Sequence, residues 1–414
     1  MTVTNTQGNS GNFSGIEKYF YLQINIKNKQ WIFNPEDLLR FLYEEEAGNL
    51  SPVCEFDLLI QDTSILQYLN EGNSIDVTIG GYDKLPKDKS GSNISAPNKQ
   101  QFSVTVVRLE VSYDSFPFIQ IYCSGIIGDY GYIANNNMSI IKQKSSVDAI
   151  KQVLKEDDEF TNIDSKTKAS FKDTQNWVQY NISNKRFISN IWLHSYSPNN
   201  TLFLGINSNN TFILRDKLYL LEQITKKDFK YIFSNFSGDK DKNKVIQYDG
   251  ILFTQSNSIL NLTSCYNLNK LVYDLDNAQE VTISSDIKNM GISSNSKLNR
   301  NSSITNTSAT ASVHNLNVHD NYHLAYLSNI GNLMSVSGCK LILNFTNIFL
   351  SDLSILDMIY VTVNELDPLA NSTAKGESGN YLVSRITRCI MNNKFTTTVA
   401  CNRESINEMS GELR

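Results

Sequence analysis

The residues best suited to chemistry in this sequence are three histidines, His314, His319 and His323. The last two are four residues apart, a spacing that places two imidazoles on one face of a helix, where they can hold a metal ion. No glutamate follows in the HExxH pattern of zinc proteases, and His314 lies in a stretch rich in Asn, Ser and Thr. We therefore interpret these histidines as structural side chains and predict no metal site.

A second pattern resembles the opening of a calcium-binding loop. In the stretch "DKDKNKVIQYDG", Asp239, Asp241 and Asn243 occupy the first, third and fifth positions of such a loop. Lys244, however, stands where the loop needs a glycine for its sharp turn, and Gly250 stands where a bidentate glutamate should complete the ligand shell. We interpret this segment as a solvated turn.

Two acidic runs could supply the paired carboxylates of a glycoside hydrolase. They are Glu44-Glu45-Glu46 and Glu156-Asp157-Asp158-Glu159, and both fall at the ends of predicted helices in polar surroundings. Nothing there would raise the pKa of one carboxyl while holding down that of another, as acid–base catalysis requires. We interpret both runs as solvated surface.

The sequence contains neither the GxSxG motif of serine hydrolases nor the GxxxxGK[ST] motif of nucleotide-binding loops. It therefore predicts no catalytic residue, no cofactor-binding residue, no cofactor and no enzymatic activity. Trp31, Trp177 and Trp192 could line a sugar-binding groove, but each also fits the edge of a strand or helix core, the interpretation that we favour. Six scattered cysteines without a CxxC pair are predicted to be reduced core thiols of a chain made in a cytosol: Cys54, Cys123, Cys265, Cys339, Cys389 and Cys401.

Composition sets the class of fold that must position these residues. The chain has 414 residues, is 40% hydrophobic and contains 20 Tyr and 20 Phe, enough to bury substantial cores. Short apolar runs bounded by Asn, Ser and Gly are typical of β-rich proteins. The net charge of -5 argues against a dedicated nucleic-acid binder. No window reaches the roughly 20 apolar residues that span a bilayer, and no signal peptide is visible at the polar N-terminus.

Strands are predicted where apolar and polar residues alternate, beginning with "YFYLQINIKN" from Tyr19. Further strands in the first third of the chain, joined by turns, indicate a barrel or sandwich and are expected at 54–62, 74–81, 102–113 and 118–127. Residues 34–47 are predicted to form a helix, because Asn34 can cap it, Pro35 suits its first turn and Gly48 can end it.

From about Asn135 the pattern becomes mixed. Amphipathic helices are predicted at 145–160 and 182–197, followed by a hairpin at 201–216. Residues 286–313, rich in Asn, Ser and Thr, are predicted to form a long exposed loop. A helix at 320–334 and a second set of strands complete the pattern, the strands at 245–255, 281–285, 339–347, 357–366, 380–391 and 394–403.

The last two of these strands resemble a known family. The stretch "SGNYLVSRITRCIMNNKFTTTVACNRES" is similar to the terminal hairpin of the central baseplate hub proteins of contractile-tailed bacteriophages, whose fold also forms the N-terminal half of type VI secretion spike proteins. The family's Gly-x-Tyr-x-Val strand corresponds to Gly379, Tyr381 and Val383, and its return strand ends near an arginine, here Arg403. Patterns in the order expected of the family extend the resemblance over residues 17 to 406.

The resemblance implies a β-dominated α+β fold. It would consist of two tail-tube-like antiparallel β-barrels with an α+β insert domain and a segment rich in helix and loop. The expected parts are a flexible arm at 1–16, a first barrel at 17–133, the insert at 134–243, a second barrel at 244–285 and 335–406, an Asn/Ser-rich loop and helix at 286–334, and a tail at 407–414.

The function that the resemblance implies is that of a structural hub in the virion's tail baseplate, assembled in the host cytoplasm. Three copies would present six barrels and so join a sixfold tail tube to a threefold central spike. The implied partners are two further copies of the chain, a spike protein, a tail-tube or tube-initiator protein and baseplate wedge proteins. DNA would pass through the channel without specific binding, and no membrane insertion is expected. A carbohydrate-binding or adhesive virion β-protein and a peptidoglycan or glycan hydrolase remain open as alternatives.

Overall fold

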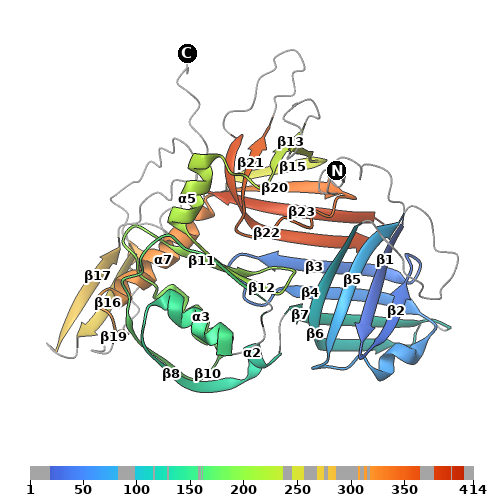
Figure 1. Ribbon diagram of the computed structural model, residues 1–414, viewed down its shortest axis with the longest axis horizontal. Helices are drawn as coiled ribbons and strands as arrows, with labels where there is room; N and C mark the ends of the chain where they lie inside the picture. Colours follow the sequence, from blue (N-terminus) through green and yellow to red (C-terminus); the bar gives the residue numbers. More distant parts are fainter. Residues whose placement is uncertain are drawn as a thin grey trace, which may run out of the picture.

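The computed structural model of the chain is dominated by β-strands, which form one large sheet and three small ones (Figure 1). The predicted arm, the tail, the calcium-like segment and most of the Asn/Ser-rich loop lie outside the residues that the structure describes. Those residues are 19–82, 98–114, 117–127, 130–156, 160, 162–235, 245–255, 268–274, 278–285, 306–307, 312–314, 318–363, 377–392 and 394–404.

The first module, β1 to β7, begins with the alternation that the sequence predicts. In β1 (Tyr19–Ile26), Phe20, Leu22, Ile24 and Ile26 are all buried. The antiparallel ladders run in the order β4-β7-β6-β5-β1-β2, and each strand predicted in this region is confirmed. The bounds are β2 (Lys29–Phe33), β4 (Val53–Ile60), β5 (Ser74–Tyr82), β6 (Asn98–Ser112) and β7 (Ile119–Ile127), with a short 3-10 helix, η1 (Thr63–Gln67), before β5.

The helix predicted at 34–47 is wrong, because these residues form a turn followed by β3 (Leu38–Glu46). The capping signals produce only the turn, in which the amides of Asp37 and Leu38 both donate to the Asn34 carbonyl. Beyond a register shift near Leu38, buried and less buried residues alternate along β3. The strand pairs with β4 on one edge and with β22 on the other. The hydrogen bonds of these two ladders outweigh the local helix preference, which tertiary context often overrides.

The second module contains seven strands in the order β14-β13-β21-β22-β23-β20-β15, and it includes the predicted terminal hairpin. The ladder between β22 and β3 joins it to the first module in one fourteen-stranded sheet. Closure of each module into a barrel stays a prediction. The strands are β13 (Ile232–Ser234), β14 (Val245–Gln247), β15 (Gly250–Gln255), β20 (Cys339–Thr346), β21 (Met358–Thr362), β22 (Gly379–Met391) and β23 (Lys394–Arg403).

The insert between the modules mixes helices and strands, as predicted. It contains a two-stranded ribbon that the sequence analysis missed, formed by β8 (Asn136–Lys144) and β10 (Gln175–Ser183). The predicted hairpin is β11 (Leu202–Ile206) and β12 (Thr211–Asp216), which β9 (Asn162–Lys166) joins in parallel. The helices are α2 (Tyr130–Ala134), α3 (Ser146–Glu156), α4 (Asn184–Leu193) and α5 (Lys217–Lys226).

A separate small sheet lies beside the long helix α7 (Tyr322–Val336), which confirms the helix predicted there. The two longest strands of this small sheet fall within residues 244–285, the span expected for the second barrel, but they are not part of the large sheet. Conversely, β13 falls within the span expected for the insert but pairs with β21 in the large sheet. The domain boundaries therefore stay a prediction. The strands of the small sheet are β16 (Leu268–Asp274), β17 (Gln279–Ser285), β18 (Asn306–Thr307) and β19 (Ser312–His314).

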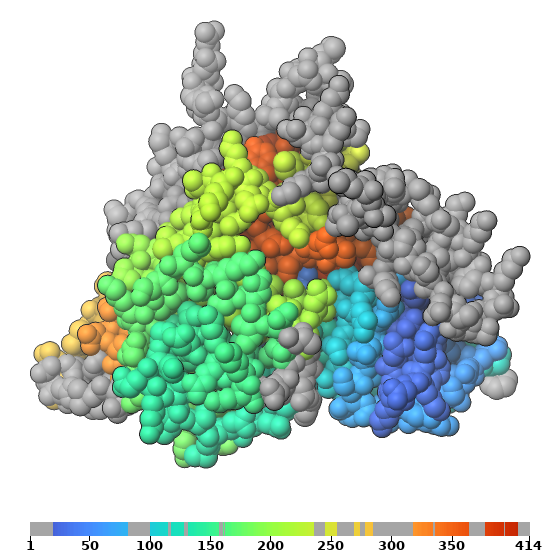
Figure 2. Space-filling model, in the orientation of Figure 1, coloured from blue at the N-terminus to red at the C-terminus, as the bar shows by residue number. Residues whose placement is uncertain are grey.

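Two large apolar cores hold most of these parts together, and a small third cluster around Leu327 packs α7 on β17. One core is shared by the first module and the insert, and the other fills the second module and the α5 face that packs on it. Figure 2 shows the insert in green beside the first module in blue, below the orange-red second module. Cys54, Cys123, Cys339 and Cys401 are buried free thiols, which confirms that these four lie in the cores, and Cys389 is a half-buried free thiol. None of the helices in the described part of the chain is long and apolar enough to cross a bilayer.

Candidate functional site

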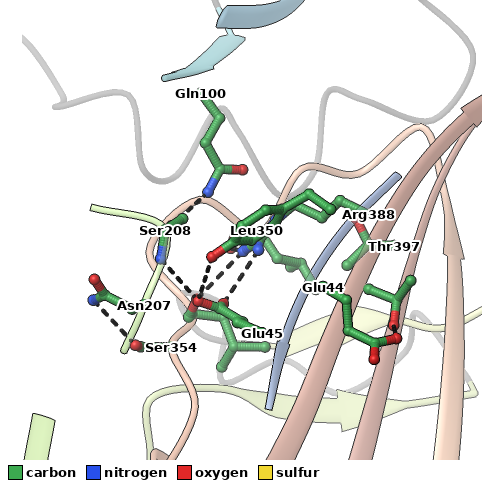
Figure 3. A network of polar contacts seen from close by, with 12 residues as sticks. Glu44, Glu45, Gln100, Asn207, Ser208, Leu350, Ser354, Arg388 and Thr397 are labelled. Atoms are coloured by element: carbon green, nitrogen blue, oxygen red, sulfur yellow. Dashed lines mark hydrogen bonds and ion pairs between the residues drawn. The ribbon is translucent and has the colours of Figure 1, made fainter. Parts of the chain in front are cut away.

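The most concentrated polar site is a buried ion pair where the first module, the second module and the insert meet (Figure 3). Glu45 on β3 and Arg388 on β22 both have fully buried side chains, and Arg388 Nη1 lies 3.2 Å from Glu45 Oε1. The two residues are 343 positions apart in the sequence. The ladder between β3 and β22 brings them together, so the pair exists only once both modules have folded.

Glu45 accepts hydrogen bonds from both the insert and the first module. Its Oε2 accepts the Ser208 amide at 2.9 Å and the Tyr43 hydroxyl at 3.2 Å. Ser208 lies in the β11–β12 turn of the insert, and its hydroxyl accepts a bond from Gln100 on β6 at 2.9 Å. One carboxylate on β3 therefore fixes the tip of the insert hairpin against the first module.

Arg388 completes the junction on the side of the second module. Its guanidinium donates to the backbone carbonyls of Phe349 at 3.4 Å, Leu350 at 3.3 Å and Leu353 at 3.5 Å, in the loop that follows β20. The same group lies 5.8 Å from the centre of the Tyr43 ring. Arg388 is thus held by four oxygens, as a buried arginine requires.

Burial dominates the electrostatics of this junction. It raises the pKa of the Glu45 carboxyl, against the opposing influence of Arg388 and the hydrogen bonds that Glu45 accepts. Burial and the nearby Glu45 also raise the pKa of the Tyr43 hydroxyl. A site in which every charge is matched and closed to solvent is suited to holding modules in register. It has no open position for a substrate.

The sequence analysis missed this site because it assigned the acidic run at 44–46 to the end of a helix. The interpretation of the run as solvated surface is wrong for Glu45, which is fully buried, whereas Glu44 is half-buried and Glu46 is exposed. Burial alternates along β3 with Phe41, Tyr43 and Glu45 inward, but the residue types hide this alternation, because Leu42 is apolar and Glu45 is charged.

The terminal hairpin carries a second buried arginine. Arg403 at the end of β23 lies 4.4 Å from the centre of the Tyr381 ring on β22 and donates to the Ser378 carbonyl at 3.3 Å. The Tyr381 hydroxyl in turn donates to the Glu377 carbonyl at 2.5 Å. The sequence had singled out this tyrosine and this arginine, and the structure shows that they contact each other in the second core.

Comparison with known proteins finds the same fold in tail proteins. No protein-family model matches the chain, and no curated protein matches it in sequence. The structure is similar to the tail protein from Neisseria meningitidis MC58, with a TM-score of 0.55 and 8% identity over 93% of this chain and 97% of that one. It is also similar to the 43 kDa tail protein of prophage MuSo2 from Shewanella oneidensis, with a TM-score of 0.54 and 9% identity over 94% and 100%.

The chain has a phage tail-protein fold. A chain of the half-lidded Francisella PdpA-VgrG complex shares it, with a TM-score of 0.51 and 10% identity, and the alignment covers 100% of this chain but 63% of that one. The resemblance to baseplate hub proteins is therefore confirmed at the level of the fold. At such low identity, residue roles do not transfer between these proteins, so the site must be argued from its own contacts.

In this tail-protein fold, the predicted candidates His319 and His323 serve packing together with His194, whereas His314 is the last residue of β19. His194, the C-cap of α4, stacks on the Tyr322 ring of α7 at 3.8 Å between ring centres, and its Nδ1 donates to the Asn190 carbonyl at 2.8 Å. His319 Nε2 donates to the His194 carbonyl at 3.1 Å, and His323 Nδ1 lies 3.4 Å from Lys270 Nζ. In the described part of the chain no three His, Cys, Asp or Glu side chains form a metal-binding group.

Helix α7 is further held by Asn329, a buried amide on its inner face. Its Nδ2 donates to the carbonyls of Leu193 at 3.1 Å, the last residue of α4, and of Ser195 at 2.8 Å, just beyond the helix. The last carbonyls of a helix have no intrahelical partner, so this amide satisfies groups that would otherwise be buried unpaired. The α4–α7 contact is therefore polar and aromatic, in contrast to the apolar cores on either side.

Acid is expected to weaken this contact through His194. Burial lowers the His194 pKa from 6.5 to about 4, with smaller contributions in the same direction from Lys270, His323 and His319. Below pH 6.5 the unfolded chain binds a proton at His194 that the native chain does not, so stability is lost as the pH falls from 6.5 to 4. The loss should total about 3 kcal/mol. Urea unfolding followed by tyrosine and tryptophan fluorescence across this range measures it.

The matched control is His194→Phe, which keeps a ring over Tyr322 but cannot titrate. Its stability should depend less steeply on pH between 6.5 and 4 than that of the wild type. The pKa of His319 is also lowered by burial, so part of the slope should remain. Equal slopes for the two proteins would contradict the assignment to His194.

The remaining sequence candidates serve structural roles in the residues that the structure describes. Trp177 and Trp192 are buried and donate to the carbonyls of Lys144 at 3.0 Å and Leu202 at 2.6 Å, which confirms their interpretation as core residues. Trp31 is half-buried and donates to Ser64 Oγ at 3.1 Å. Of the second acidic run, Glu156 is exposed and the other three residues lie outside the described part of the chain.

Proposed function

We propose that this chain is the structural hub of a phage tail baseplate and that it is not an enzyme. The observation that supports this most strongly is the structural similarity to two tail proteins. It extends over nearly the whole of this chain and over 97% and 100% of the lengths of those two proteins. The polar site with the most buried charge joins modules and offers no reactive arrangement, which agrees with a structural role.

The hub would be a homotrimer with pseudo-sixfold symmetry. Each chain contains two β modules whose relative position is fixed by the β3–β22 ladder and by the Glu45–Arg388 pair. Three copies would present six such modules around one axis, which could match a sixfold tube on one side and a threefold spike on the other. A fixed spacing between the modules matters for this role, because a flexible link would let the ring lose its sixfold outline.

The partners of such a hub follow from its position. A central spike protein would bind below it, a tail-tube or tube-initiator protein above it, and baseplate wedge proteins around it. DNA would pass through the channel without specific binding, in keeping with a chain of net charge -5. The protein would be located in the tail baseplate of the virion after assembly in the host cytoplasm.

The test is the mass and symmetry of the full-length protein. Analytical ultracentrifugation should give about three times the 46.8 kDa chain mass, and cryo-electron microscopy should show a threefold ring with six β modules around a channel. A particle that stays monomeric at all concentrations, alone and with a spike protein, or a ring of another symmetry, would overturn the proposal.

The two alternatives predict different outcomes in the same preparation. An adhesive protein should bind glycans on an array, and a hydrolase should release soluble fragments from peptidoglycan. Release that is abolished by changing one Asp or Glu would replace the hub with an enzyme. Neither activity is expected of the hub.

A further inference from the structure

The outward face of the β8–β10 ribbon is apolar. Met138, Ile140, Val178 and Tyr180 are 70%, 59%, 54% and 73% exposed. The ladder register places Ile140 opposite Val178 and Met138 opposite Tyr180, so the four side chains form two adjacent cross-strand pairs on one face. We call this group the ribbon patch.

The opposite face of the ribbon is packed normally. Ile141 and Trp177, which are also cross-strand partners, are both buried against the insert core. A sheet with one face on the core usually has polar residues on the other face. Four side chains of this size, each more than half exposed, offer about 400–500 Å² of accessible surface, in the range at which a patch on a monomer is often functional.

The charges beside the ribbon patch have one sign. Lys142 follows Ile140 by two residues and so shares its outward face, and Lys144 ends the strand. The sequences of β8 and β10 contain no Asp or Glu. The face therefore suits an apolar surface that carries carboxylates at its edge.

A surface of that kind exists at the β6–β7 turn of the first module. Tyr113 and Phe118 flank this turn and are 66% and 39% exposed. Asp114 lies between them in sequence, and its carboxylate accepts the Ser112 hydroxyl at 2.9 Å. Glu110, near the end of β6, is also exposed but forms an ion pair with Arg108, so Asp114 is the carboxylate that this surface offers to a partner. We call this group the turn patch.

The two patches belong to opposite sides of one copy. Figure 1 shows the ribbon at the lower left, curving beneath α3, and the first module at the lower right. They cannot meet within one chain. A contact between two different patches of identical copies is head-to-tail, and it closes into a ring when the rotation between copies allows.

We propose that the ribbon patch of one copy receives the turn patch of the next copy in the ring. This inference rests on the proposed homotrimer and names the surfaces that form it. A stable interface buries roughly 800 Å² on each partner. The ribbon patch provides about half of that area on one copy, and the surface around it, including the lysines at its edge, would provide the remaining area. Each copy would use both patches, so three identical contacts would close the ring.

The first experiment changes the ribbon patch in the full-length protein. The double variant Ile140→Asp/Tyr180→Asp places two charges on the outward face, where they should leave folding intact, as circular dichroism can verify. Its dissociation constant for self-association should rise at least 100-fold, which ultracentrifugation measures. Leu218→Asp on α5, at a site 46% exposed outside both patches, is the matched control and should assemble as the wild type does.

The second experiment identifies the partner surface by restoring assembly through charge reversal and by cross-linking neighbouring copies. Lys142→Asp should weaken assembly, and adding Asp114→Lys should restore it if the two rims meet between copies. Ile140→Cys with Tyr113→Cys should give disulfide-linked products that stop at the trimer, the result of a closed ring.

The outcomes separate this inference from the hub proposal. A trimeric wild type whose ribbon variants also remain trimeric, without cross-linking or charge rescue, would overturn the inference alone. Protection of the ribbon patch from surface labelling only after a spike protein is added would likewise overturn it. A wild type that never forms a threefold particle would overturn both.

Discussion

Replacing Arg388 with methionine is expected to lower the free energy of unfolding by about 3–5 kcal/mol, because it leaves the fully buried Glu45 carboxylate without its counter-ion. The Ser208 amide and the Tyr43 hydroxyl would remain as donors to Glu45, but neither carries a charge. The backbone carbonyls that now accept from Arg388 would also lose their donors. The shift of the urea unfolding midpoint, measured with an unchanged slope, gives the size of the effect.

The matched control is Arg385→Met on the same strand. Arg385 pairs with Glu44 at 3.8 Å, but both side chains are about one-third exposed, so its loss should cost less than about 1 kcal/mol. Glu45→Gln added to Arg388→Met should recover a large part of the loss. The glutamine is uncharged and can still accept the Ser208 amide. If Arg388→Met and Arg385→Met lower the free energy of unfolding equally, burial of the Glu45–Arg388 pair does not increase its contribution to stability.

Replacing Asp216 with alanine is expected to have an effect of similar size, although no cation is involved. Asp216 is fully buried, and its Oδ1 accepts the Tyr219 amide at 2.8 Å as the N-cap of α5. Its Oδ2 accepts the amides of Lys168 at 2.8 Å and Ala169 at 2.7 Å. Loss of a cap costs about 1 kcal/mol, and each further buried amide left unpaired costs about 1–3 kcal/mol. The total should be about 3 kcal/mol or more.

Two comparisons make this prediction specific. Asp216→Asn keeps one acceptor oxygen and should lose roughly half as much stability as the alanine variant. Ser183→Ala removes the N-cap of α4, whose hydroxyl accepts the Arg186 amide at 3.4 Å, and should cost about 1 kcal/mol. If Asp216→Ala costs no more than Ser183→Ala, the bonds to the β9–β10 loop do not stabilise the fold.

Where the sequence predicted the structure correctly, the signal was local. The alternation in β1, the amphipathic spacing in α3 and the turn between β11 and β12 each decide their own element within a few residues. The β8–β10 ribbon escaped prediction because Met138, Ile140, Val178 and Tyr180 face outward. Apolar residues on both faces remove the alternation that marks a strand with one buried face.

The candidate site could not be predicted because its parts are far apart in the chain. Nothing near Glu45 indicates a counter-ion, since Arg388 lies 343 residues away on β22. Nothing near His194 indicates that it will stack on Tyr322 of α7 rather than stay exposed. Helical signals at Asn34 and Pro35 were real, but they produce a single turn once β3 has ladder partners on both edges.

The sequence by itself determined that this is a β-rich chain with free cysteines in its cores and two strands near its end, whereas Tyr381 and Arg403 were singled out by the resemblance to hub proteins. Composition and short-range periodicity carry that information, because each strand buries one face whatever its neighbours are. Only the tertiary structure decided that β3 joins the two modules and that Glu45 is buried. Both outcomes depend on which strand lies alongside β3, and that is settled by contacts between residues far apart in the sequence.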